Sequence, residues 1–254
     1  MKRFFGFAFI ICLLVTSCST LNNRASMIHA LAFIKSGDYE DALEELNFIL
    51  ENEPENEKAL SLRTEAYFML NDYKNAYKDS KKLVEKYPKP QNLIYKAETE
   101  CELEMYADAI KDCKRALNYS TITEVESFAC WNLLAVSYSE SEMYEESIKY
   151  YNLVLEKYKA PEAYYERALS YLYLNNFENA LADFEKSIEG VSQYSKEYQQ
   201  KFYTDDFYYY YGLSLLGTKR IDQALANFSK VKKNSDYPKL NDYIQFCKKN
   251  KSHN

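Results

Sequence analysis

The chain has 254 residues, 47% of them hydrophobic, which is enough to bury a substantial core in one or two domains. Five glycines and five prolines are few, and they favour long helices over an architecture dense in turns. The formal net charge of −6 leaves no excess of basic residues to neutralise phosphates, so we expect no nucleic-acid partner.

Residues 1–17 have the pattern of a signal peptide. Lys2 and Arg3 give a positive start, and an apolar run of about a dozen residues follows. This run is shorter than the roughly 20 residues that span a bilayer, but it fits the core of an export signal. It ends in Val-Thr-Ser-Cys at residues 15–18, which resembles the lipobox of bacterial lipoproteins.

The resemblance to lipoproteins implies that Cys18 becomes the mature N-terminus and carries a diacylglycerol, usually with a third acyl chain, which suffices for stable anchoring. Ser19, in place of Asp, resembles the sorting signal of outer-membrane lipoproteins. We therefore expect residues 18–24 to form a short lipidated tether on a bacterial membrane, the outer membrane in the first instance, facing the periplasm or the cell surface. The alternatives are an ordinary cleaved signal and an uncleaved anchor.

A short motif recurs along the rest of the chain. It places an aromatic or aliphatic residue three positions before a small residue, as in GDYEDAL and NNFENAL. The small residues lie 34, 33, 38, 33 and 44 positions apart, at Ala42, Ala76, Ala109, Ser147, Ala180 and Ala224. This pattern resembles the tetratricopeptide repeat (TPR), in which two antiparallel helices form each repeat.

The resemblance implies an all-α fold: a right-handed TPR solenoid of about six helical hairpins with a C-terminal capping helix. The repeats are expected within 25–236, at 25–54, 56–88, 90–119, 125–160, 161–190 and 203–236. Residues 237–254 would form the capping helix and tail, with Leu240, Tyr243, Ile244 and Cys247 on one face. Residues 191–201 lengthen one or both flanking helices in this prediction, or form a loop.

Motifs for catalysis are missing from the sequence. It has no HExxH, GxSxG, glycine-rich phosphate loop or CxxC pair, so we expect no enzyme, no cofactor and no metal site. His29 falls on the predicted packing face of the first helix, and His253 falls in the tail. Cys113 and Cys130 fall in adjacent helices, where they form either a disulfide or a pair of buried free thiols.

The remaining candidate site is the concave groove, which TPR proteins line with exposed positions of the first helix of each repeat. Carried over to this sequence, these positions favour a protein-binding groove at Phe68, Tyr165, Leu169, Tyr173, Tyr209 and Leu213. Glu65 and Glu98 fall in the same register, whereas the Lys/Asn/Arg clamp that grips a carboxylate is absent. Such a groove fits a peptide with apolar anchors. The alternative is that these side chains pack against neighbouring helices.

The function predicted from these features is a non-catalytic, membrane-anchored scaffold that binds a protein or peptide partner, as a subunit or assembly factor of a cell-envelope complex. In size and architecture the chain resembles the pilotins of type IV pili and the TPR lipoprotein of the β-barrel assembly machinery. The alternative is a lipoprotein that binds a glycan or another small ligand in a tyrosine-rich groove.

Overall fold

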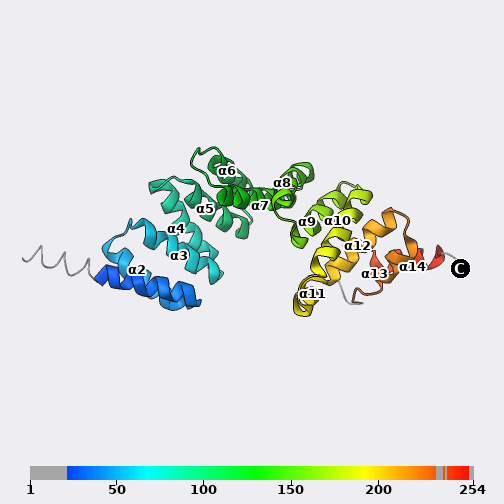
Figure 1. Ribbon diagram of the computed structural model, residues 1–254, viewed down its shortest axis with the longest axis horizontal. Coiled ribbons are helices and arrows are strands. Elements are labelled where there is room, and N and C mark those ends of the chain that lie inside the picture. The colour runs from blue at the N-terminus through cyan, green and yellow to red at the C-terminus, as the bar shows by residue number, and fades with distance from the viewer. Residues whose placement is uncertain (1–21, 233–236, 238, 252–254) are drawn as a thin grey trace, which may run out of the picture. The chain divides into compact units, whose positions relative to one another are not determined.

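The structure is a computed structural model that describes residues 22–232, 237 and 239–251 (Figure 1). The predicted signal peptide, Cys18 and His253 lie outside the described residues. All regular secondary structure in the described part is helical. In that part, every helix falls short of the length and apolar character that a membrane span requires.

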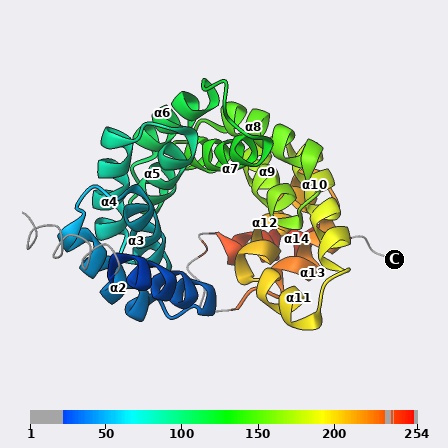
Figure 2. The same cartoon turned by 60° about the vertical axis from the view of Figure 1, so that its left-hand side comes forward.

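The contacts divide the chain into an N-terminal unit, residues 1–133, and a C-terminal unit, residues 134–254, with the division inside α7 (Glu124–Glu140). The N-terminal unit holds a helix over residues 22–36, α2 (Tyr39–Asn52), α3 (Glu57–Met69), α4 (Tyr73–Lys86), α5 (Pro90–Glu102) and α6 (Tyr106–Leu117). The C-terminal unit holds α8 (Tyr144–Lys157), α9 (Pro161–Tyr173), α10 (Phe177–Val191), α11 (Lys196–Phe202), α12 (Asp205–Gly217), α13 (Ile221–Phe228) and α14 (Leu240–Lys249). Within each unit, helices that follow one another pack side by side (Figure 2). The predicted all-α fold of consecutive helical hairpins is confirmed.

The hairpins share one turn geometry. Each reverses at a residue in the left-handed backbone region, with φ between +56° and +87°, at Gly37, Asn71, Glu104, Glu142, Asn175 and Lys219. At Asn71, the backbone N–H donates to the Phe68 carbonyl (2.9 Å), and the next N–H donates to the Tyr67 carbonyl (2.8 Å). Two such bonds satisfy carbonyls that the helix end leaves open. The turn therefore places the second helix in the same way each time.

The small residue of the motif lies five positions after each turn, at the helix–helix contact. Ala76, Ala180 and their counterparts are fully buried. Because alanine or serine occupies this position, the two helices of a hairpin approach closely, and larger side chains fill the space on either side. Phe184, Phe207 and Phe228 are the largest of these fully buried side chains.

The segment between α10 and α12 differs from the prediction. The helices on either side do not lengthen to include it: α10 ends at Val191, and the separate helix α11 begins at Lys196. Ser195 caps α11 by accepting from the Tyr198 N–H, which favours a fresh helix start over continuation. At the other end, the Phe202 ring packs against Tyr165, with the ring centroids 5.9 Å apart.

The last helix, α14, packs against α13. It buries Leu240 and Cys247 in a cluster with Phe228 and Leu215, and Tyr243 and Ile244 pack partly buried against that cluster. These four residues of α14 are the ones expected on the apolar face of a capping helix. Their burial covers apolar surface that α12 and α13 would otherwise leave exposed.

Candidate functional site

The C-terminal unit has an open pocket of about 320 Å³, which we call the aromatic pocket. It lies among α9, α10, α12 and α14 and is lined by Leu172, Tyr173, Asn175, Phe177, Tyr210, Leu213, Leu216, Gly217 and Tyr243. The Tyr173 side chain is 52% exposed, and its ring stacks on Tyr144 with the centroids 4.8 Å apart. A Cβ atom added to Gly217 would lie 2.2 Å from the Phe177 ring. Any other residue at this position would therefore clash with the ring.

Two of the predicted groove residues, Tyr173 and Leu213, line this pocket. Tyr209 does not: it is 7% exposed, and its ring stacks on Tyr237 with the centroids 4.5 Å apart. Tyr209 therefore packs inside the C-terminal unit, which is the alternative that the sequence left open for the groove residues. The repeat pattern alone could not show that the Tyr237 ring stacks on Tyr209.

Tyr165 and Leu169 are half-buried in a cluster with Phe184 and Phe207. The Tyr165 ring lies 5.8 Å from the Phe184 ring and 5.9 Å from the Phe207 ring, measured between centroids. Burial, aided by the nearby charge of Glu166, raises the pKa of Tyr165. These two side chains support the packing of the C-terminal unit.

Phe68 lines a pocket of the N-terminal unit, of about 380 Å³, which we call the acidic pocket. It lies between α3 and α5 and is lined by Thr64, Glu65, Phe68, Met69, Tyr95, Glu98 and Thr99. Burial raises the pKa of Glu98 to about 7, and the neighbouring charge of Glu65 raises it further. Burial also raises the pKa of Glu65. The sequence register had placed both carboxylates in the groove, but it had not shown that they interact.

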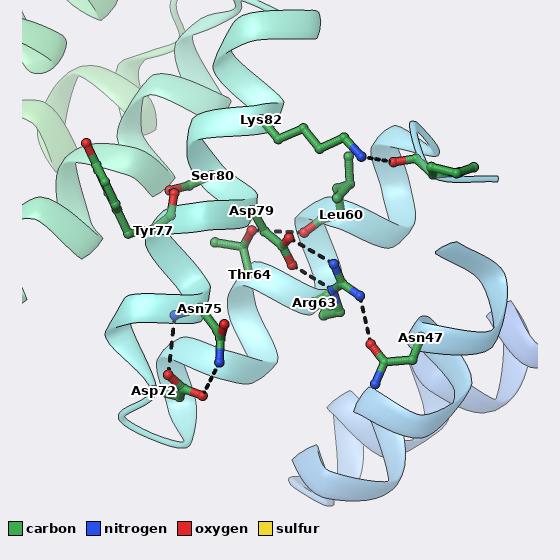
Figure 3. Close-up of polar contacts among 11 residues, drawn as sticks. Asn47, Leu60, Arg63, Thr64, Asp72, Asn75, Tyr77, Asp79, Ser80 and Lys82 are labelled. Carbon is green, nitrogen blue, oxygen red and sulfur yellow. Dashed lines mark hydrogen bonds and ion pairs between the residues drawn. The ribbon is translucent and has the colours of Figure 1, made fainter. Parts of the chain in front are cut away.

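An arginine links three helices in each of two repeats, an arrangement that the sequence reasoning missed. Figure 3 shows the Arg63 guanidinium between two partners: Nε and Nη2 donate to Asp79 (2.6 and 2.9 Å), and Nη1 donates to Asn47 (2.7 Å). Arg167 repeats these contacts with Asp183 and Asn152. The signal was present as an arginine 16 residues before an aspartate in repeats two and five.

Two further repeats carry a polar pair at the same positions. Lys96 donates to Asp112 at 2.5 Å and also bonds Glu100, which is fully buried and has one oxygen without a hydrogen-bond partner. In the first repeat, His29 Nδ1 lies 3.1 Å from Glu45 Oε1. The His29 side chain is exposed, so its predicted place on the packing face is wrong.

The cysteines of the described residues are not in disulfides: Cys101 is half-buried, and Cys113, Cys130 and Cys247 are buried. A hydrogen bond with Cys130, followed by burial, raises the pKa of the Cys113 thiol, which favours the protonated thiol over the reactive thiolate. Among the described residues, no three His, Cys, Asp or Glu side chains are grouped so that they could hold a metal ion.

Comparison with known families identifies the repeats. Models of tetratricopeptide repeats match residues 58–90, 128–156 and 161–189, and a model of the C-terminal tetratricopeptide repeat of Fis1 matches residues 29–66. The chain is a tetratricopeptide repeat protein. A search of curated proteins gave no match.

Solved TPR structures share the fold over most of this TPR protein. One is a TPR protein of Parabacteroides merdae (19% identity, TM-score 0.59, 90% of this chain and 85% of that chain). Another is PilW, a type IV pilus biogenesis factor (16% identity, TM-score 0.68, 88% of this chain and 97% of that chain). A third is PilF of Pseudomonas aeruginosa (14% identity, TM-score 0.67, 92% of this chain and 99% of that chain). At these identities the likeness establishes the fold alone.

Proposed function

We propose that this TPR protein is a non-catalytic, membrane-anchored scaffold that holds a protein partner in the cell envelope, as a subunit or assembly factor of an envelope complex. The observation that carries the proposal is the aromatic pocket, which offers Tyr173 and Leu213 to a ligand on a framework of helical hairpins. TPR proteins typically act as binding scaffolds, and PilW, a pilus biogenesis factor, has a similar fold.

The chemistry of the aromatic pocket suits an apolar anchor of a partner. Its volume of about 320 Å³ accommodates one or two large side chains, and ligand pockets run from about 300 to 1,000 Å³. Tyrosines provide large, rigid contact surfaces and are enriched among the residues that dominate binding energy. Tyr173, Tyr210 and Tyr243 line this pocket together with leucines, so we expect a Leu, Phe or Met side chain of the partner to occupy it.

The membrane attachment in this proposal rests on the leader sequence. A lipid on Cys18 would hold the chain at the membrane through a short tether, so a partner would be bound near the lipid surface. The test is a crosslinking pull-down from native membranes with wild type beside Cys18→Ala. We expect wild type to recover a discrete envelope protein from the membrane fraction, and Cys18→Ala to be found in the soluble fraction without it. If wild type is itself soluble, the anchor proposal fails.

The pocket is tested separately with Tyr173→Ala/Leu213→Ala in the anchored protein. Truncating two anchor contacts is expected to weaken capture of the partner by about tenfold or more. Tyr158→Ala is the matched control, because Tyr158 is 65% exposed and lies outside the aromatic pocket. Equal capture by wild type and the pocket variant, with unchanged helicity, would remove the pocket from the binding site.

A glycan or small envelope ligand is the second candidate for the same pocket. It is favoured by the half-exposed Tyr173 ring, since aromatic faces stack on sugars as well as on peptide side chains. Saturable quenching of tyrosine fluorescence by glycan fragments, lost in Tyr173→Ala, together with recovery of no protein in the pull-down, would favour this candidate over the scaffold.

A further inference from the structure

The acidic pocket of the N-terminal unit holds two carboxylates in an apolar setting. Glu65 comes from α3 and Glu98 from α5, at the same position relative to the turn of each hairpin, and the charge of one raises the pKa of the other. Phe68, Met69 and Tyr95 supply the surrounding apolar surface. An anion in such surroundings is unfavourable unless a cation or hydrogen-bond donors compensate for it.

Neighbouring buried acids of the same unit have such compensation. Asp79 accepts two hydrogen bonds from Arg63, and Asp112 accepts one from Lys96. Glu65 and Glu98 differ: within the part of the chain that the structure describes, neither carboxylate has an ion-pair or hydrogen-bond partner. Asp79 and Asp112 therefore have cationic partners, whereas in the described part of the chain Glu65 and Glu98 have none.

The two threonine hydroxyls of the pocket are already engaged with backbone carbonyls. The Thr64 hydroxyl donates to the Leu60 carbonyl at 2.9 Å, and the Thr99 hydroxyl donates to the Lys96 carbonyl at 2.8 Å. Glu65 and Glu98 are the charged groups that the pocket presents to a ligand. A ligand that complements them carries positive charge.

We propose that the acidic pocket binds a lysine or arginine side chain of a protein partner, with the cation between Glu65 and Glu98. The proposal rests on the scaffold function proposed above and names the chemistry of one contact within it. Phe68 and Tyr95 supply aromatic surface for the methylene stem and the cation, and Met69, which is 51% exposed, also lines the pocket.

The size and donor set of the pocket favour an organic cation over a bare metal ion. Its volume of about 380 Å³ exceeds what a single ion fills, while a long basic side chain occupies such a space. Ca²⁺ takes six to eight oxygen ligands, and here two carboxylates face the pocket. A guanidinium or ammonium bridging the two acids forms charge-assisted hydrogen bonds with both.

The test is a selection of random peptides from a display library on the purified full-length protein. We expect peptides selected on wild type to be enriched in Lys or Arg, and this enrichment to be lost on Glu65→Gln/Glu98→Gln, which keeps the shape of both side chains. Glu145→Gln/Glu189→Gln makes the same change in net charge at exposed positions outside the pocket, so it should leave the enrichment intact.

A double-mutant cycle then tests direct contact. The basic residue of the best selected peptide is replaced by norleucine, and Kd is measured for both peptides on wild type and on Glu65→Gln/Glu98→Gln. We expect the replacement to weaken binding at least about tenfold on wild type and to have little effect on the variant. An equal loss on both proteins would show that the basic residue binds elsewhere, and would overturn the proposal.

The outcomes separate this proposal from the scaffold function. Selected peptides without basic enrichment, alongside membrane capture that survives Glu65→Gln/Glu98→Gln, would refute the acidic pocket as a cation site and leave the scaffold standing. Failure of wild type to recover any peptide or membrane protein would refute both. Circular dichroism checks that the variant is folded; because it loses two uncompensated charges, we expect its melting temperature to be no lower than that of wild type.

Discussion

At the scale of single residues, half-buried carboxylates without a cationic partner in the described part of the chain are the feature most directly open to experiment. Glu166, in α9, is the example in the C-terminal unit. Burial raises its pKa to about 7, and the charge of Glu140 adds to the shift. Unlike Glu98, it does not line either of the pockets described above.

Glu166→Gln should change how stability depends on pH. Because the folded-state pKa is about 7 and the ordinary pKa of a glutamate is 4.5, the folded state binds more protons than the unfolded state between these values. The contribution of Glu166 to the free energy of unfolding therefore falls as the pH rises through this window. We expect Glu166→Gln to raise the melting temperature near pH 8 and to change it little near pH 4.

Thermal denaturation at the two pH values provides the measurement, with Glu156→Gln, an exposed position on α8, as the control. The same change in melting temperature at both pH values would mean that Glu166 does not titrate in this window.

At the scale of the helices, Arg63 and Arg167 each bind side chains of the two flanking helices, and we call this arrangement an arginine clamp. Each clamp links three successive helices. Asp183 is 2% exposed, and the Arg167 guanidinium binds it through two nitrogens while a third reaches Asn152 on α8. Lys186 Nζ lies 3.8 Å from Asp183, which gives only partial compensation. The clamp therefore matters chiefly because removal of the arginine leaves a buried carboxylate almost unpaired.

Arg167→Met is expected to destabilise the C-terminal unit by about 3 kcal/mol, because breaking a buried pair costs about 3–5 kcal/mol and Lys186 offsets part of the loss. Arg167→Met/Asp183→Leu should recover most of that loss, since it removes the unpaired charge together with its partner.

Chemical denaturation measures both effects. Arg220→Met is the matched control: Arg220 pairs with Glu185 at 2.8 Å with both side chains 47% exposed, and exposed pairs contribute about 0–1 kcal/mol. A single variant that is as stable as the control would show that the clamp does not stabilise the hairpins.

At the scale of the whole chain, contacts are dense between successive helices and separate into two units. In repeat proteins each repeat contacts its neighbours, so a local defect should open its own surroundings first. Two fully buried alanines in equivalent positions make this testable: Ala76 in the N-terminal unit and Ala180 in the C-terminal unit.

Ala180→Leu should overpack the contact between α9 and α10 and cost about 1–3 kcal/mol. Hydrogen exchange is expected to quicken in α9 and α10, where Ala180 lies beside Ala168 and Phe184, and to stay unchanged in α3 and α4. Ala76→Leu should give the reverse pattern, and each variant thus serves as the control of the other. Equal loss of protection in both units would indicate one cooperative unit.

The sequence was sufficient for the hairpins because each small residue marks a helix–helix contact at a nearly constant spacing. It was insufficient where a segment distant in the sequence covers a side chain, and where a local cap starts a helix outside the repeat pattern. Tyr209 is buried because Tyr237 covers it, and α11 starts afresh because Ser195 caps it. The pairing of Glu65 with Glu98 depends on how adjacent repeats stack, which a repeat motif does not specify.

The cysteines also allow the separation of individual helices to be followed in the native protein by the rate at which each thiol is labelled. Cys101 is half-buried, whereas Cys113, Cys130 and Cys247 are buried, so a thiol-reactive label can reach the latter three only when their helices separate. Cys113 and Cys130 report on the N-terminal unit and Cys247 on α14. Labelling the unmodified protein for increasing times would therefore rank the separation of these helices, with no substitution introduced.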